Sequence, residues 1–128
     1  TLFPGYKIFY DAPIAIVVVD GLVPLFGTFF QPRKNPRNGL TYLDVKQLQR
    51  FDGGNRVMPV KRWEKYLVGC VEDFATSQDM QRVTIRPSSM NSWNSKERES
   101  RFKMRYDVTA KRSGYRYREE DLRYVKDL

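Results

Sequence analysis

A chain of 128 residues, of which 41% are hydrophobic and 30% charged, is long enough for one domain with a packed core, and this balance excludes a disordered chain. The sequence has no histidine and one cysteine, Cys70, which excludes intrachain disulfides, Ser-His and Cys-His nucleophile pairs, and metal sites built from histidine or several thiolates. The net charge of +8 favours an anionic partner, and the lack of disulfides leads us to expect a cytoplasmic (intracellular) protein.

The first part of the chain has a strand-rich pattern. Residues 14–19 form a continuous apolar, largely β-branched run, which is typical of a strand covered on both faces of a sheet. Asp20-Gly21 predicts a tight hairpin turn, so we expect residues 22–30 to form the returning strand. The longest apolar run is too short to cross a bilayer, so no membrane partner is expected.

A loop rich in proline and asparagine separates this hairpin from a third strand. Residues 31–39 have a loop composition, with three positive charges that could also contact an anionic ligand. Residues 40–49 return to a strand pattern, in which the two-residue period places Asp44 and Leu48 on the same face. Three successive strands joined by turns predict an antiparallel meander.

The second half alternates helices and strands. Residues 58–77 repeat apolar residues at helical spacing and predict a long helix, with Pro59 tolerated in its first turn. Residues 81–86 predict a strand, so strand, helix and strand would form a crossover connection. A second helix is predicted near residues 101–113, and it stops at Gly114.

Two short closing strands complete the pattern, at residues 115–117 and 122–126, with an acidic turn between them. The predicted fold class is therefore α+β (mixed α/β), with a central, largely antiparallel sheet and two helices. We expect a single domain over residues 1–128. Because the chain begins with Thr1 and not Met, we also expect it to be processed or to be part of a longer protein.

The junction between the third strand and the long helix, residues 49–59, contains two adjacent glycines with arginines on both sides. Gly53 and Gly54 lie where backbone N–H groups at a helix start could hold an anion, between Arg50 and Arg56. A plain connector explains the same residues equally simply, as a glycine turn followed by a proline in the first helical turn.

The segment Arg50-Phe51-Asp52-Gly53-Gly54-Asn55 resembles the glycine-rich turn of the GNAT superfamily of acyl-CoA N-acyltransferases, whose pattern is Arg/Gln-x-x-Gly-x-Gly/Ala. The sixth position holds Asn55, a residue that tolerates the left-handed backbone region better than most. The order of elements is also similar: strand, turn, long helix, strand, a second helix ending in glycine and an aromatic residue, and a closing strand. The resemblance extends over residues 14–128 and implies a GNAT-like fold.

The resemblance implies an N-acyltransferase that moves an acetyl group from acetyl-CoA to the amine of a small molecule or protein. The cofactor pyrophosphate would lie over the glycine turn and helix start, and the pantetheine arm would lie along the preceding strand. The residues that the resemblance assigns to the cofactor are Leu48, Arg50, Gly53, Gly54, Asn55 and Arg56.

Catalysis in this family rests on positioning and proton transfer. Members often use a carboxylate on the strand before the turn as base and a tyrosine on the final helix as acid, which here implies Asp44 and Tyr106. Ala110 occupies the usual tyrosine position, and Tyr106 lies one turn earlier on the same helix face. Each residue also has a structural explanation, Tyr106 as a core residue and Asp44 as the partner of a basic side chain. No metal is implied.

Two functions without catalysis compete with this one. Basic and aromatic residues alternate in residues 101–106 and 115–118, which favours a nucleic-acid-binding or nucleoprotein module. The aromatic residues of the first segment also fit a helix core face, and the sequence has no zinc finger, KH loop or RNP motif. A structural module of a larger assembly, such as a viral or phage component, is the second alternative.

Overall fold

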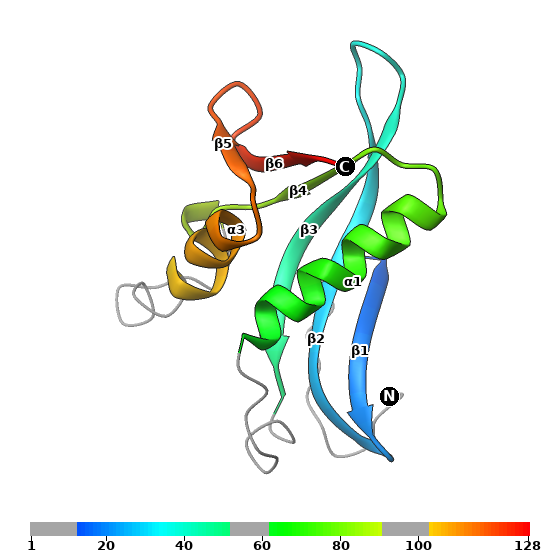
Figure 1. The fold of residues 1–128 in the computed structure, drawn as a ribbon, viewed down its shortest axis with the longest axis vertical. Coiled ribbons are helices and arrows are strands. Elements are labelled where there is room, and N and C mark those ends of the chain that lie inside the picture. The colour runs from blue at the N-terminus through cyan, green and yellow to red at the C-terminus, as the bar shows by residue number, and fades with distance from the viewer. Residues whose placement is uncertain (1–12, 52–61, 91–102) are drawn as a thin grey trace.

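The computed structural model describes residues 13–51, 62–90 and 103–128, in which a six-stranded sheet carries helices against one face (Figure 1). The elements in chain order are β1 (Ile14–Asp20), β2 (Val23–Lys34), β3 (Thr41–Arg50), α1 (Trp63–Ser77), β4 (Arg82–Ile85), the 3-10 turn η2 (Ser88–Met90), the π-helical segment η3 (Lys103–Val108), α3 (Thr109–Arg112), β5 (Arg116–Arg118) and β6 (Arg123–Asp127). The mixed α/β class and the largely antiparallel sheet are therefore confirmed.

The strand order is β1-β2-β3-β4-β6-β5. β3 and β4 run parallel, and all other neighbours are antiparallel. Parallel neighbours cannot be joined by a tight turn, so α1 serves as the crossover between β3 and β4, as the sequence predicted. The last two strands form a hairpin in which the second strand, β6, pairs with β4, so β5 lies at the edge of the sheet.

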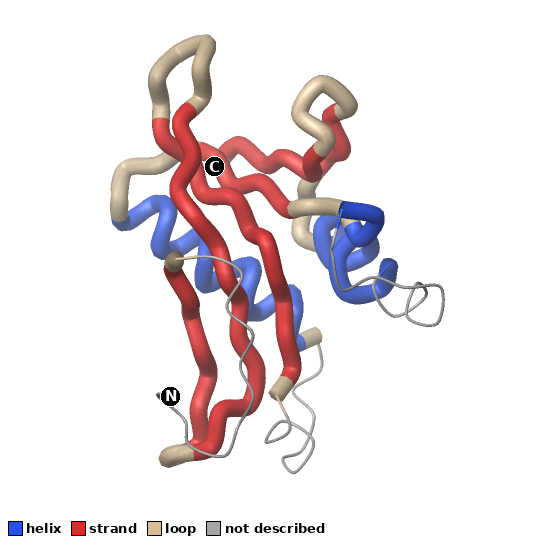
Figure 2. The backbone as a smooth tube through the Cα atoms, turned by 180° about the vertical axis from the view of Figure 1, so that it is seen from behind, coloured by secondary structure: helices blue, strands red, loops and turns tan. Residues whose placement is uncertain are grey.

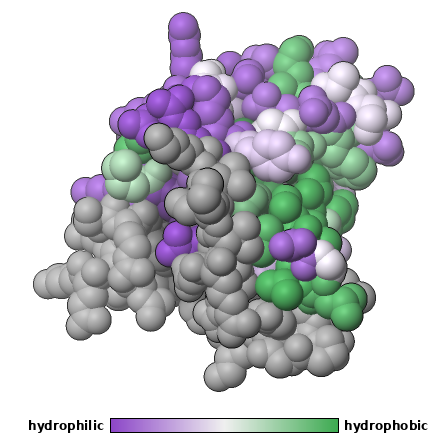
Figure 3. All heavy atoms as spheres, turned by 60° about the horizontal axis from the view of Figure 1, so that its bottom comes forward, coloured by the Kyte–Doolittle hydropathy of each residue, from purple (hydrophilic) through white to green (hydrophobic). Residues whose placement is uncertain are grey.

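β1 forms the predicted hairpin with β2 but lies at the edge of the sheet, where its only described strand neighbour is β2. Gly21 has φ of 61°, which the tight turn requires and a glycine adopts readily. Ile14, Ile16 and Val18 pack against the core, whereas Val19 is 44% exposed. The expectation of a strand covered on both faces is therefore wrong, and apolar residues gather on this flank of the molecule (Figure 3).

β2 is longer than the sequence predicted, because residues 31–34 extend the strand instead of starting a loop. They pair with the first residues of β3, from Gln31 opposite Asp44 to Lys34 opposite Thr41. Pro32 is tolerated because β1 pairs with β2 only as far as Phe30, so here the ladder runs on one side of β2 among the described strands.

A β-bulge in β3 changes which residues share a face. Phe29 pairs with Gln47 and Phe30 with Val45, so Lys46 is the extra residue. The bulge places Leu48 in the core on the helix side and leaves Asp44 outside the core cluster. The prediction that Asp44 and Leu48 share a face is therefore wrong, because one extra residue reverses the alternation.

α1 begins at Trp63, and the earlier part of the predicted helix, residues 58–61, lies outside the described residues. Its buried residues include Leu67 and Val71 at the predicted spacing, whereas Cys70 is only half-buried. The second predicted helix is a π-helical segment that continues into the short α3. The core cluster consists of Leu25, Phe26, Phe30, Leu43, Val45, Leu48, Trp63, Leu67, Val68, Val71, Ala75, Val83, Ile85, Tyr106, Ala110, Tyr115 and Tyr124.

The helices pack on one face of the sheet and leave the other without a described helix. Seen from behind, the strands lie in front of α1 (Figure 2). The two faces differ in composition, because the helix side carries the apolar cluster and the opposite side carries Asp44, Thr84 and several arginines.

Candidate functional site

The parallel pair at the centre of the sheet separates soon after it forms. β3 and β4 pair over only three positions, Leu43 with Val83 to Val45 with Ile85. One more backbone bond, from the Arg86 N–H to the Val45 carbonyl, ends the ladder. β3 then continues to Arg50 while β4 turns away from it (Figure 1). The edge of β3 beyond Val45 therefore faces helical residues instead of a strand.

Tyr106 of η3 occupies this edge. Its phenol accepts a hydrogen bond from the Leu48 N–H at 3.1 Å and donates one to the Leu48 carbonyl at 3.3 Å. The tyrosine is 2% exposed, so the aromatic ring is core and the hydroxyl replaces the missing strand partner. The structure thus brings together two residues that the resemblance assigned to one site, Leu48 and Tyr106.

The start of α1 lies beside the same edge. Trp63 packs its ring 5.6 Å from Phe26, and the Arg105 guanidinium lies 5.4 Å above the Trp63 ring. Arg105 also reaches the Leu48 carbonyl at 3.5 Å. The end of β3, the first turn of α1 and η3 therefore meet around Leu48, with a phenol and a guanidinium as polar groups.

The π-helical segment that carries Tyr106 is held by the residue that follows it. Asp107 accepts a hydrogen bond from the Ser88 hydroxyl at 2.6 Å and another from the Ser88 N–H at 3.0 Å. Short π-helical stretches often occur at functional sites. The Asp107–Ser88 contact ties η3 to the end of β4, which fixes Tyr106 between the separating strands.

The glycine turn proposed as a phosphate cradle is not described. Gly53, Gly54, Asn55 and Arg56 lie within residues 52–61, outside the described residues. Arg50 is exposed at the end of β3, next to this segment.

Asp44 lies on the other side of the sheet from Tyr106. It is fully buried and accepts a hydrogen bond from the Thr84 hydroxyl at 2.7 Å. The carboxylate lies 3.2 Å from Arg123 Nε, 3.5 Å from Arg86 Nε and 3.6 Å from an Arg33 guanidinium nitrogen. A buried carboxylate surrounded by three guanidinium groups holds these arginine side chains in place. The structure does not bring Asp44 to Tyr106.

Sequence reasoning did not find the arginines that surround Asp44. It named Lys46 or an arginine as the partner of Asp44 without saying which arginine, because the three that surround Asp44 come from β2, the end of β4 and β6. The signal was present as alternation: Arg82, Thr84 and Arg86 follow one another at every second position. That these three residues share a face with Asp44 follows only from the pairing of Thr84 with Asp44 in the sheet.

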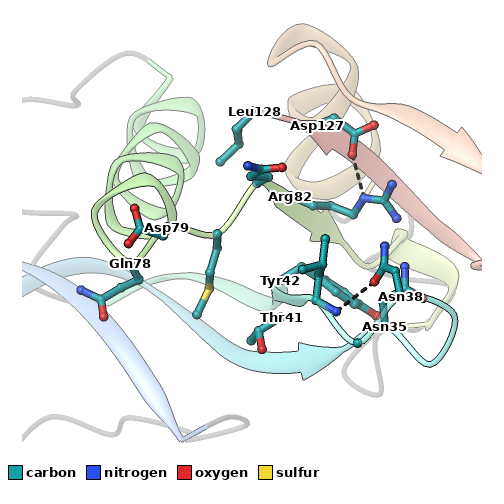
Figure 4. Close-up of a pocket in the computed structure, with 13 residues that line it drawn as sticks. Asn35, Asn38, Thr41, Tyr42, Gln78, Asp79, Arg82, Asp127 and Leu128 are labelled. Carbon is teal, nitrogen blue, oxygen red and sulfur yellow. Dashed lines mark hydrogen bonds and ion pairs between the residues drawn. The ribbon is translucent and has the colours of Figure 1, made fainter.

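Two cavities open beside this arginine cluster, near the β2–β3 hairpin. One, of about 510 Å³, is lined by residues that include Arg33, Arg118 and Arg123. The other, of about 710 Å³, lies between the hairpin, the end of α1 and the C-terminal residues (Figure 4). Arg82 lines both cavities, and its Nε donates a hydrogen bond to Asp127 at 2.7 Å.

Within the described ranges, no group of three or more acidic or cysteine side chains is placed to hold a metal ion. The same ranges contain no helix with the length and apolar character needed to span a membrane. Comparison of the chain with protein-family models, curated proteins and solved structures found no match.

Proposed function

We propose that this protein is an acyl-CoA-dependent N-acyltransferase that moves an acetyl group from acetyl-CoA to an amine. The observation that carries the proposal is the separation of the parallel strands β3 and β4 beside the start of α1. A strand edge that loses its strand neighbour is where an extended ligand with amide groups, such as a pantetheine arm, can pair, and at Leu48 the Tyr106 phenol now occupies the backbone groups that such an arm would meet. The order strand, glycine turn, helix, strand also supports it.

Under this proposal the pyrophosphate lies at the glycine turn before α1, and the thioester lies near Leu48. The amine nitrogen attacks the thioester carbonyl carbon, the carbon–sulfur bond breaks, and the sulfur leaves with the electron pair. Tyr106 supplies a proton to that sulfur, the attacking amine loses its proton to water, and a proton from water restores the phenol. The position of the phenol supports this role, because the hydroxyl lies beside Leu48 at the strand edge, where the acyl arm would run.

Asp44 takes no part in this proton transfer, because it lies on the opposite face of the sheet with three arginines. Its role in the proposal is structural. The acceptor is an amine of a small molecule or of a protein, and the net charge of +8 favours an acceptor that carries negative charge.

The experiment that tests the proposal follows the release of free CoA thiol from acetyl-CoA in the presence of a panel of small amines and lysine peptides. Acceptor-dependent release by the wild type supports the proposal. Tyr106→Phe should then lower turnover more than it raises the KM for acetyl-CoA, since it keeps the ring and removes the proton donor. Tyr66→Phe is the matched control, because Tyr66 is 56% exposed on α1. Absence of release with every acceptor would count against the proposal.

A further inference from the structure

The face of the sheet opposite α1 is lined by arginines from four strands. The alternation places Arg33 beside Tyr42, two residues before Asp44, and pairs Asp44 with Thr84. The same alternation, followed through the strand pairing, places every second residue of β4, β6 and β5 on this face. The basic residues on this face and in the adjoining hairpin loop are Arg33, Arg37, Arg82, Arg86, Arg116, Arg118 and Arg123.

The carboxylates on this face do not neutralise these arginines. Asp44 pairs with Arg33, Arg86 and Arg123, while Asp127 pairs with Arg82 and Arg118. Glu120 and Asp121 also line the cavity at the hairpin, so among the described residues the seven arginines named above outnumber these four carboxylates by three. Asp44 is fully buried beneath guanidinium groups that are up to 44% exposed, so an approaching anion meets the arginines first.

The arginines extend along a line instead of surrounding one point. Neighbouring strands lie about 4.8 Å apart, so arginines on β2, β4, β6 and β5 span several strand spacings. A single phosphate would contact only part of this line, whereas a polyphosphate chain could contact all of it. Figure 4 shows Arg82 near the hairpin, beside Tyr42, which lines both cavities.

The structure shows which of the basic residues in the two basic and aromatic segments a partner can reach. Arg105 lies over Trp63, and Tyr106 and Tyr115 are buried, so two of the three described aromatic residues that alternated with basic ones in the sequence are core. Arg116 and Arg118 from the same stretch instead face the open side through β5. Part of the charge that suggested a nucleic-acid partner therefore lies on a surface that the sequence did not identify.

We propose that this arginine face binds the phosphate backbone of single-stranded nucleic acid. Guanidinium groups match phosphate oxygens in charge and geometry. The cavity of about 510 Å³ is lined by Arg33, Arg37, Arg82, Arg118 and Arg123, so a backbone segment that enters it meets five guanidinium groups. Contacts to phosphate carry no sequence information, and Tyr42 offers a ring for stacking with any base. Binding should therefore be independent of sequence and sensitive to salt.

Fluorescence anisotropy with a labelled 15-nucleotide single strand at two salt concentrations tests this proposal. The variant Arg33→Gln/Arg118→Gln removes two partly exposed charges from the face. The control Lys65→Gln/Lys111→Gln removes two exposed charges from the helix side. The arginine variant should weaken binding several-fold and lower the slope of log K against log salt by about 1.4, since each single-strand phosphate contributes about 0.7. The lysine variant should leave both quantities unchanged.

Three results would overturn the proposal: no binding by the wild type at low salt, equal losses in both variants, or tighter binding of a duplex of the same length. If the arginine variant fails to fold, amide chemical shifts of the wild type decide. Shifts induced by the oligonucleotide in the β2–β3 hairpin, β5 and β6 support the proposal, and shifts confined to α1 contradict it. Neither arginine lies at the Leu48–Tyr106 edge, so thiol release from acetyl-CoA tests the transferase separately.

Discussion

The phenol oxygen of Tyr106 lies 3.1 Å from the amide nitrogen of Leu48 and 3.3 Å from its carbonyl oxygen, across 58 residues of sequence. One side chain therefore satisfies both backbone groups of a strand residue at the point where the neighbouring strand has turned away. This contact joins the strand before the glycine turn to the segment after β4. It also places the only functional group of Tyr106 at the proposed acyl site.

Removing this hydroxyl should destabilise the protein. Tyr106→Phe keeps the ring in the core but leaves the Leu48 N–H and carbonyl without this partner, at a cost of about 1–3 kcal/mol in the free energy of unfolding. Urea denaturation measures the difference. Tyr66→Phe, at an exposed site on α1, should change the free energy by less than about 0.5 kcal/mol. Equal values for both variants would show that the hydroxyl does not hold the strand edge.

Asp44 should be a structural anchor for the arginine face. Asp44→Asn keeps the shape of the side chain but leaves three guanidinium groups without a negative partner, and we expect a loss of about 3 kcal/mol. Arg33→Gln removes only the 44% exposed member of the cluster and should cost less than about 1 kcal/mol. Chemical denaturation of both variants gives the comparison. A loss for Asp44→Asn as small as that for Arg33→Gln would contradict the anchoring role.

Tyr115 should make the protein less stable at high pH. Burial, followed by the nearby Glu72 carboxylate to which its hydroxyl donates at 2.9 Å, raises the pKa of Tyr115 well above its ordinary value. The unfolded chain releases this proton above about pH 10, whereas the folded protein retains it. The stabilising effect is therefore complete below about pH 10 and is lost as pH rises further.

Urea denaturation at several pH values between 8 and 11 measures this dependence. Tyr115→Phe should lower the free energy of unfolding by about 1 kcal/mol at pH 8 and should reduce the slope above pH 10. Part of the slope should remain, because burial also raises the pKa of Tyr124. An unchanged slope in Tyr115→Phe would exclude this tyrosine as its source.

Replacing each of two glycines with alanine should change the stability of the protein in opposite directions. A Cβ on Gly27 would lie 3.0 Å from the Ile16 carbonyl oxygen and 3.3 Å from the Phe51 ring, so Gly27→Ala should destabilise by about 1–3 kcal/mol. Gly69 lies within α1 and has no atom within 4 Å of the corresponding position, so Gly69→Ala should stabilise by up to about 1 kcal/mol. Thermal melting of the two variants should show shifts of opposite sign, and shifts of the same sign would contradict the packing around Gly27.

Local patterns predicted the element types well, because they depend on neighbouring residues. The Asp20-Gly21 turn, the spacing of Leu67 and Val71, and the helix stop at Gly114 all correspond to observed features. The bulge at Lys46 and the edge position of β1 could not be predicted, since both depend on the register and order in which strands pair and not on the local sequence. The same reason explains the extension of β2, because its last residues are polar and gain strand geometry only by pairing with β3.

The candidate site was predicted in part. Leu48, which the resemblance assigned to the cofactor, and Tyr106, which it assigned to catalysis, lie in contact, but no pattern in the sequence indicated that the phenol would bond to the Leu48 backbone. Asp44 was expected on the same face as Leu48, and the bulge separates them. The arginine face was missed because its members are scattered along the chain and come together only through the strand order β4-β6-β5.

The measurement that tests the central claim most directly is thermal unfolding with and without saturating acetyl-CoA. A ligand at one hundred times its dissociation constant stabilises the folded state by about 2.7 kcal/mol, which raises the melting temperature of a chain of this size by several degrees. We predict such a shift with acetyl-CoA in the wild type, and none when Gly53 and Gly54 are both replaced by leucine. The absence of any shift in the wild type, alongside a salt-sensitive shift with a single-stranded oligonucleotide, would contradict the transferase function.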